Sequence, residues 1–186
     1  MTNFELIEES LNGIKVFVRK KFEDKRGKFS KLLCSQELKE YINIQNLAQI
    51  NYSYNSSTGT VRGMHYQAKP YAETKLVTCI QGSVYDVSVD LRKDSPTFCK
   101  YFGIELSEKN NLSVLIPKGF AHGFQSIQSD SILIYAHDEN FIESHNRIIN
   151  PSDAKINIHW PLQISNISEK DNNAPFINDQ FTGIKL

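Results

Sequence analysis

The sequence predicts an all-β fold, a jelly-roll barrel with a few short helices at its periphery. Several short segments in the middle of the chain alternate apolar and polar residues, which is the period-two pattern of half-buried strands. Residues typical of turns separate these segments, and a succession of short strands with this spacing is characteristic of barrels and sandwiches. Helical patterns are scarce along the chain.

The predicted strands begin at Lys75–Gln81, which leads through Gly82 into Ser83–Asp90, the segment with the clearest alternation. Three further strands are expected at Phe102–Leu106, Ser113–Pro117 and Ser131–Tyr135. The turns that separate the strands are expected at Asp94–Pro96, Ser107–Asn111 and Ser129–Asp130.

Two short helices are predicted outside this series of strands. Ser35–Glu40 begins with a serine that could cap the helix, and Ser168–Asp171 could open a second helix near the C-terminus. With so little helical signal, the helices are expected to be small additions to the barrel.

The charge and length of the chain limit the classes of function. One domain is expected over residues 1–186, because the length is ample for a sizeable core and no repeat or linker divides it. Lys and Arg together number 21, as do Asp and Glu, so the net charge is zero. Binders of nucleic acid or membrane surfaces normally carry a basic excess. The short basic run Arg19–Lys21 is interpreted as a solvated edge, and neither nucleic acid nor membrane is expected as a partner.

The apolar segments and the cysteines favour a cytoplasmic protein. No apolar run approaches the roughly 18 residues needed to span a bilayer, and the N-terminus has no signal-peptide pattern. Cys34, Cys79 and Cys99 are odd in number and lack C-x-x-C spacing. Reduced thiols are therefore expected, in preference to a disulfide framework or a zinc site.

The segment Val61–Gln67 carries the clearest chemical signal. It places His65 in a strand-like run near a basic residue and a phenol, with no acidic neighbour, which suits a base that takes a proton from carbon. Gly63 allows another chain or a ligand to approach the backbone closely. Taken alone, however, a single histidine in a strand is more often structural than catalytic.

The other histidines divide into two groups. His122 lies in Pro117–Phe124, a glycine-flanked turn and strand entry that follows an apolar run. His137, His145 and His159 have polar, loop-like surroundings and are expected at the surface.

Metal binding, hydrolysis and dinucleotide binding are poorly supported. Many barrels of this type hold a metal with two histidines one residue apart and a glutamate shortly after. Here Gly63 and Gln67 flank His65 at that spacing, and no His-x-His pair occurs. The chain also lacks a G-x-S-x-G elbow, a P-loop and a G-x-G-x-x-G motif. No metal or organic cofactor is therefore expected.

Four segments, in matching order and spacing, resemble the dTDP-4-dehydrorhamnose 3,5-epimerase family. They are Val61–Gln67, Gly82–Arg92, Ser95–Phe98 and Pro117–Phe124. The likeness extends from about residue 24 to about residue 171, which is most of the chain. The resemblance implies a cupin-type jelly roll, usually a homodimer, that acts on nucleotide-linked 4-keto sugars without metal or organic cofactor.

The resemblance also implies a mechanism. A ketone at C4 acidifies the C–H bonds at C3 and C5, so a base can form an enolate, and reprotonation from the opposite face inverts the carbon. By resemblance, His65 is the base and Asp171 fixes its tautomer. Tyr135 is the proton donor on the other face, and Lys75 neutralises the developing enolate oxygen.

Six further residues are assigned to substrate binding by the same resemblance. Arg62 and His122 would line the sugar–diphosphate pocket, since guanidinium groups suit phosphate. The remaining assignments are Gln49 and Asn51 for the nucleotide, with Arg26 and Lys170 near the ligand. In family dimers the N-terminal region can reach the partner's pocket, so Arg26 could serve the neighbouring site.

Some residues differ from the usual pattern of the rhamnose-pathway enzymes. Lys31 stands where a glutamate is typical, Phe141 where a second tyrosine is typical, and Glu143 and Asn146 replace a proline and a glutamate. These changes leave the proton-transfer residues intact. They leave open which nucleotide and which sugar are bound, and whether C5 is inverted as well as C3.

Two other functions remain as alternatives. A sugar-nucleotide 3,4-ketoisomerase with the same fold would move the carbonyl, and a non-catalytic module would only bind the sugar nucleotide. The presence of His65, Tyr135 and Asp171 together favours the epimerase.

Overall fold

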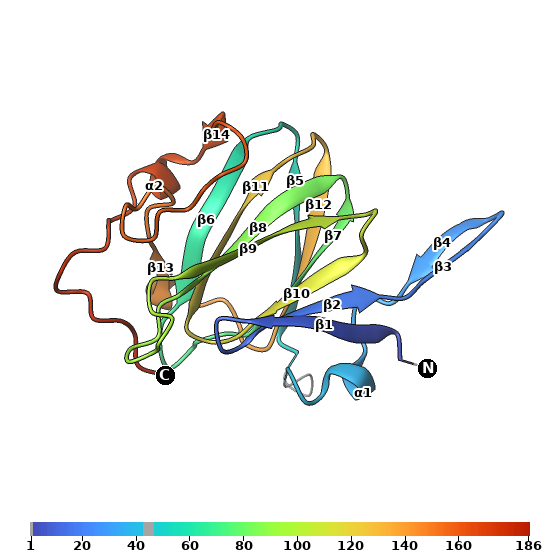
Figure 1. Ribbon diagram of the computed structural model, residues 1–186, viewed down its shortest axis with the longest axis horizontal. Helices are drawn as coiled ribbons and strands as arrows, with labels where there is room; N and C mark the ends of the chain where they lie inside the picture. Colours follow the sequence, from blue (N-terminus) through green and yellow to red (C-terminus); the bar gives the residue numbers. More distant parts are fainter. Residues whose placement is uncertain (1, 43–46) are drawn as a thin grey trace.

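Two antiparallel sheets face each other in the computed structural model, which describes residues 2–42 and 47–186 (Figure 1). The first sheet has the strand order β1-β2-β10-β7-β12-β5. Its strands are β1 (Phe4–Ser10), β2 (Ile14–Arg19), β10 (Leu112–Ile116), β7 (Lys75–Gln81), β12 (Ser131–His137) and β5 (Gln49–Asn55).

The second sheet has the order β13-β6-β11-β8-β9, and β14 joins β6 as a parallel neighbour. Its strands are β13 (Asn146–Ile148), β6 (Thr60–Gln67), β11 (Phe120–Ser126), β8 (Ser83–Asp90), β9 (Tyr101–Ser107) and β14 (Asn166–Ile167). Outside both sheets lie the hairpin β3 (Lys21–Asp24) and β4 (Gly27–Ser30), the helices α1 (Ser35–Leu38) and α2 (Glu169–Asn172), and a 3-10 turn at Glu143–His145.

The space between the sheets is filled by apolar side chains from both of them. This inner core is Ile14, Val77, Cys79, Val84, Leu106, Val114, Ile116, Phe120, Phe124 and Leu133. Because side chains alternate along a strand, the neighbouring residues of the same strands point outward and need a cover of their own.

Both outer faces are covered in part. Leu76 and Leu115 of the first sheet pack with Leu38 of α1. Val87 and Val89 of the second sheet pack with apolar residues of the C-terminal segment, including Ile149, Ile156 and Ile177. The C-terminal segment, orange to red in Figure 1, passes through β14 and α2 beside β6 and then continues to the C-terminus. The C-terminal part of the chain is therefore packed onto the barrel.

The predicted elements agree with this architecture. The strands at Lys75–Gln81 and Ser83–Asp90 have the expected bounds, and the three later strands are shifted or extended by one or two residues. The all-β barrel with short helices is confirmed for the part of the chain that the structure describes.

Two local predictions are wrong. The first helix ends at Leu38, and its N-cap is Cys34, without a side-chain hydrogen bond, so Ser35 is the first helical residue and not the cap. Arg19, interpreted as part of a solvated edge, is buried and donates to Ser30 Oγ at 3.2 Å. Its position on the inner strand β2 explains this, because β2 is hydrogen-bonded on both sides.

Strand β6 departs from regular pairing in the middle of its length. His65 pairs with His122 of β11, whereas Arg62 pairs with Phe124, so two residues of β6 stand opposite Gly123. This arrangement is a β-bulge. In a regular strand Arg62 and His65 would point to opposite faces, but the extra residue allows both to line one cavity.

Gly63, inside this bulge, makes the close approach that its position in the sequence predicts. Its φ is +124°, and a Cβ at this residue would lie 2.5 Å from Gly123 Cα and 2.8 Å from the His122 carbonyl oxygen. No larger side chain fits between β6 and β11 at this point, because the atoms that it would meet are backbone atoms.

Among the described residues, no helix is long and apolar enough to cross a membrane.

Replacing Gly63 by alanine is expected to lower the free energy of unfolding by more than the backbone strain of its positive φ would by itself. Gly27→Ala is the matched control, since its φ is +127° but nothing lies within 4 Å of its Cβ position. Positive φ costs both variants about 1–3 kcal/mol, and overpacking adds about 1–3 kcal/mol to Gly63→Ala. Urea unfolding measures the free energy of unfolding of both variants. An equal loss of stability in Gly63→Ala and Gly27→Ala would contradict the predicted clash of the added methyl group with β11.

Candidate functional site

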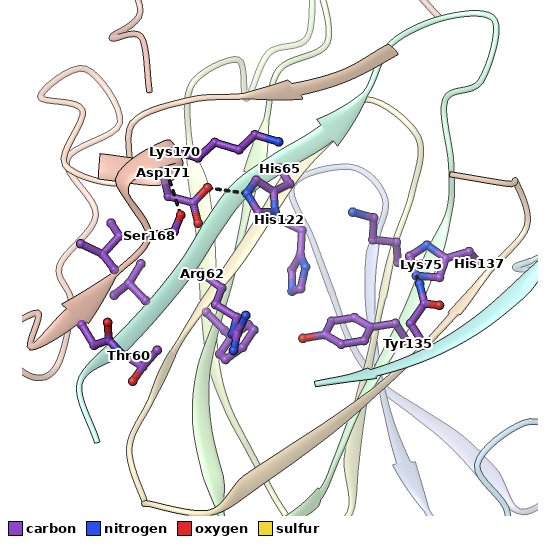
Figure 2. A pocket seen from close by; sticks show the side chains of 15 residues that line it. Thr60, Arg62, His65, Lys75, His122, Tyr135, His137, Ser168, Lys170 and Asp171 are labelled. Atoms are coloured by element: carbon purple, nitrogen blue, oxygen red, sulfur yellow. Dashed lines mark hydrogen bonds and ion pairs between the residues drawn. The ribbon is translucent and has the colours of Figure 1, made fainter. Parts of the chain in front are cut away.

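One cavity of about 530 Å³ lies between the two sheets and is closed on one side by the segment of β14 and α2. Eight of the ten predicted site residues line it: His65, Tyr135, Asp171, Lys75, Arg62, His122, Asn51 and Lys170. Figure 2 shows His65, Arg62, Lys170 and Asp171 on one side of the cavity and Lys75, Tyr135 and His137 on the other. Residues more than a hundred positions apart in the chain are thus brought together.

His65 and Asp171 form the predicted pair. His65 Nε2 lies 2.7 Å from Asp171 Oδ1, drawn as a dashed line in Figure 2. Because the carboxylate accepts a hydrogen bond, the neutral imidazole carries its proton on Nε2 and its lone pair on Nδ1. The His65 side chain is 38% exposed, whereas that of Asp171 is 5% exposed, so the imidazole is accessible and its partner is not.

Asp171 is held by its own short helix. Ser168 is the N-cap of α2 and accepts a hydrogen bond from the Asp171 N–H, while Gly63 N donates to Asp171 Oδ2 at 3.2 Å. Burial alone would raise the pKa of Asp171, but the hydrogen bonds from His65 and the Gly63 N–H outweigh it, and the pKa is lowered. The carboxylate is therefore ionised and fixed toward His65.

Tyr135 projects from β12 on the opposite wall. Its hydroxyl lies 3.0 Å from Ser53 Oγ of the neighbouring strand β5. Burial raises the pKa of Tyr135 above its ordinary value, and the hydrogen bond with Ser53 opposes this only in part. The phenol therefore keeps its proton at neutral pH, as a proton donor must.

Lys75 lies beside Tyr135 because β7 and β12 are paired, with Lys75 opposite His137. Lys75 Nζ is 3.0 Å from Glu73 Oε1, and both side chains are only 10% exposed. Burial alone would raise the pKa of Glu73, but the charge of Lys75 and the hydrogen bond from His137 lower it to about 2. The ionised glutamate holds the ammonium group at the cavity wall.

The expectation that His137 lies at the surface is wrong. His137 is buried, lines the cavity, and has its Nδ1 2.7 Å from Glu73 Oε2. The strand prediction stopped at Tyr135, two residues too early. Continuing the period of two would have placed His137 on the same face as Tyr135, so the signal was present in the sequence. Of the other two histidines, His145 is half-buried and His159 is exposed.

His122 and Arg62 complete the polar wall. His122 Nε2 lies 2.7 Å from Asp86 Oδ2, and this pair is almost fully buried. Arg62 donates from Nε to Asn55 Oδ1 at 2.8 Å, with its side chain reaching into the cavity. Its guanidinium group retains donors that can bind a phosphate.

Two predicted residues lie outside the cavity. Arg26 is at the tip of the β3–β4 hairpin, which extends away from the barrel in Figure 1, and its side chain is 84% exposed and paired with Asp24. Gln49 precedes Asn51 on β5, and its side chain accepts a hydrogen bond from Phe141 N at 2.9 Å. Within a single chain, therefore, Arg26 and Gln49 do not line the cavity that holds the other eight residues.

The four residues that differ from the usual family pattern also lie apart from the cavity lining. Lys31 pairs with Glu37 at 3.6 Å, Phe141 is 55% exposed, and Asn146 pairs with Gln67 across β13 and β6.

The cavity has the groups needed for proton transfer at carbon: an imidazole paired with a carboxylate on one side, and a protonated phenol with an ammonium group beside it on the other. Within residues 2–42 and 47–186, no three side chains among His, Cys, Asp and Glu gather as metal ligands would.

Comparison with known proteins agrees with this geometry. The family model described as dTDP-4-dehydrorhamnose 3,5-epimerase matches residues 8–179. A dTDP-4-dehydrorhamnose 3,5-epimerase of Shigella flexneri is 39% identical over 170 residues, which cover 91% of this chain and 93% of that protein.

Solved structures resemble the whole barrel. The crystal structure of dTDP-4-dehydrorhamnose 3,5-epimerase from Bacillus anthracis, with TDP and PPi bound, has a TM-score of 0.87 at 37% identity and covers 94% of this chain and 99% of that chain. A 3'-monoepimerase from Streptomyces bikiniensis, in complex with dTDP-quinovose, has a TM-score of 0.82 at 27% identity and covers 88% of this chain and 83% of that chain.

The resemblance predicted from four sequence segments is confirmed by the family match, and the cupin-type jelly roll by the solved structures. The chain belongs to the dTDP-4-dehydrorhamnose 3,5-epimerase family, a family of isomerases.

Proposed function

We propose that this protein epimerises a nucleoside-diphosphate 4-keto sugar at C3 and C5, or at C3 only. The observation that carries the proposal is the placement of the His65–Asp171 pair and Tyr135 on opposite sides of one cavity, with Lys75 nearby (Figure 2). An epimerase must remove a proton from one face of a carbon and return one to the other face. Relatives named as 3,5-epimerases and as a 3'-monoepimerase support both versions of the reaction.

In the proposed mechanism, His65 Nδ1 takes the proton from the carbon next to the ketone. Asp171 holds the Nε2 proton and stabilises the imidazolium that forms. Negative charge develops on the C4 oxygen, and the Lys75 ammonium group stabilises it. Tyr135 then delivers its proton to the opposite face of the carbon, which inverts the configuration.

Substrate binding in the proposal uses the polar wall of the cavity. Arg62 would contact the diphosphate, His122 the sugar, and Asn51 the nucleotide, with Lys170 close to the phosphates. The dTDP-quinovose complex of the Streptomyces relative supports a nucleotide-linked sugar as the ligand class. A 3,4-ketoisomerase is the second candidate, but Tyr135 on the wall opposite His65 favours inversion.

We also propose that the protein is a homodimer in which the β3–β4 hairpin reaches the partner's cavity. Exposed apolar side chains support this: Phe22 is 46% and Phe29 is 65% exposed on the hairpin, and Tyr52 is 74% exposed on the edge strand β5. An exposed edge strand with apolar residues is a typical site of association. Arg26 and Gln49 would then belong to a site completed by the second subunit.

Solvent exchange tests the base and the acid separately. With a nucleotide-linked 4-keto sugar in deuterated water, His65→Ala is expected to lower deuterium incorporation at C3 and C5 by about a hundredfold to ten-thousandfold. Tyr135→Phe should still exchange hydrogen but fail to invert, because only the opposite-face donor is lost. NMR of the recovered sugar reads both results. His159→Ala, at an exposed position, is the control, and no incorporation by the unmodified protein with any such sugar would sink the proposal.

Lys75→Met is expected to lower the exchange rate by about a hundredfold to a thousandfold, because the enolate oxygen loses its positive partner. Lys118→Met is the matched control, since Lys118 also pairs with a carboxylate, Asp138 at 3.6 Å, but lies outside the cavity lining. A similar loss in both variants would argue against a role for Lys75 at the reacting oxygen.

The dimer proposal predicts complementation between two inactive or weakened variants. Arg26→Ala keeps its own His65, and His65→Ala keeps its own Arg26, so a mixed dimer has one complete site. After co-refolding, activity should exceed the sum of the two separate variants. Activity equal to that sum, or a monomeric mass in sedimentation, would contradict the proposal that Arg26 acts across the interface.

A further inference from the structure

A third histidine–carboxylate pair, His137 with Glu73, lies beside Lys75, and the mechanism above does not use it. His137 is on the side of the cavity opposite His65 (Figure 2). His137 Nδ1 lies 2.7 Å from one oxygen of Glu73, and the other oxygen lies 3.0 Å from Lys75 Nζ. The side chains of His137 and Glu73 are 8% and 10% exposed. One buried carboxylate therefore fixes two cavity-lining groups.

The position of the protons on His137 follows from its partner. Glu73 is ionised, because the Lys75 charge and His137 lower its pKa despite burial. An ionised carboxylate can only accept, so the neutral form of His137 donates from Nδ1 and has its lone pair on Nε2. Nε2 has one neighbour in the described part of the chain, Asn51 Nδ2 at 3.5 Å, which is at the outer limit of a hydrogen bond. A buried acceptor with so weak a partner is available to a ligand.

We propose that His137 Nε2 accepts a hydrogen bond from the hydroxyl group on C3 of the bound sugar, with Glu73 as the positioning residue for both His137 and Lys75. The inference rests on the proposed function, because it takes Lys75 to bind the oxygen on C4. Since Glu73 holds Lys75 and His137 side by side, the sugar groups that they bind are neighbours. Of the two carbons next to C4, only C3 carries a hydroxyl, because C5 carries the ring oxygen and C6.

The substrate class is narrowed by this contact. A sugar that lacks the C3 hydroxyl leaves Nε2 without a donor in a buried wall, and sites built to bind a hydroxyl reject the analogue without it. The protein should therefore act on 4-keto sugars that keep the C3 hydroxyl and discriminate against 3-deoxy sugars.

Calorimetric titration with two unreactive ligands tests the contact without catalysis. The ligands are dTDP-quinovose and its 3-deoxy analogue, neither of which has the C4 ketone that acidifies C3. The unmodified protein is expected to bind dTDP-quinovose roughly tenfold more tightly than the analogue. His137→Leu should lose that preference, so that the two dissociation constants differ by less than about twofold. His159→Leu, at an exposed position, is the control and should keep the preference.

The ratio of the two dissociation constants separates loss of a specific contact from misfolding, because a misfolded variant would weaken the binding of both ligands alike. Glu73→Gln should reduce the ratio as well, because the amide can no longer fix the donor role of Nδ1. It should also lower the exchange rate through Lys75. A preference for dTDP-quinovose that survives in His137→Leu, or is absent from the unmodified protein, would overturn the inference. Failure of the unmodified protein to bind either ligand would contradict the proposed function and the inference together.

Discussion

The close contact between β6 and β11 is the constraint on which the site depends. At Gly63 the two backbones approach so closely that no side chain fits. The extra residue in β6 also shifts the alternation of side chains between the two faces of the strand. Arg62 and His65 consequently face the same cavity, although a regular strand would separate them. The Gly63 N–H also holds Asp171 at 3.2 Å. One irregularity thus sets the direction of the Arg62 guanidinium group, the His65 imidazole and the Asp171 carboxylate behind it.

Three histidines of the cavity each have a carboxylate partner, at the same distance of 2.7 Å, but in different surroundings. His65 is partly exposed, and its partner comes from the C-terminal segment. His122 and His137 are buried, and their partners Asp86 and Glu73 come from the barrel or its loops. Each carboxylate selects one tautomer and so determines which ring nitrogen can act on a ligand. The geometry therefore separates one accessible imidazole, the proposed base, from two buried imidazoles whose orientation is fixed.

The middle strands could be predicted from the sequence because period-two alternation is a local signal. The cluster of His65, Lys75, Tyr135 and Asp171 was predicted from the resemblance to the family, since no local pattern links residues so far apart in the chain. The β1–β5 strands were not predicted, and Arg19 was misjudged, because its burial depends on pairing with a strand almost a hundred residues away. The bulge could not be foreseen either, since the register is set by pairing between two strands, β6 and β11, that are far apart in the sequence. His137 could have been found by extending the β12 alternation by two residues.

Asp171 reaches the cavity on a four-residue helix that belongs to the segment covering the outer face of the second sheet. The inner core of the barrel contains no residue of that segment, whereas His65 depends on it for its carboxylate partner. In the proposed mechanism, displacing the C-terminal segment would therefore impair proton abstraction without removing any residue of the inner core. A tag or fusion partner at the N-terminal end is consequently less liable to disturb Asp171. In the proposed mechanism, activity would report whether the C-terminal segment is packed on the barrel.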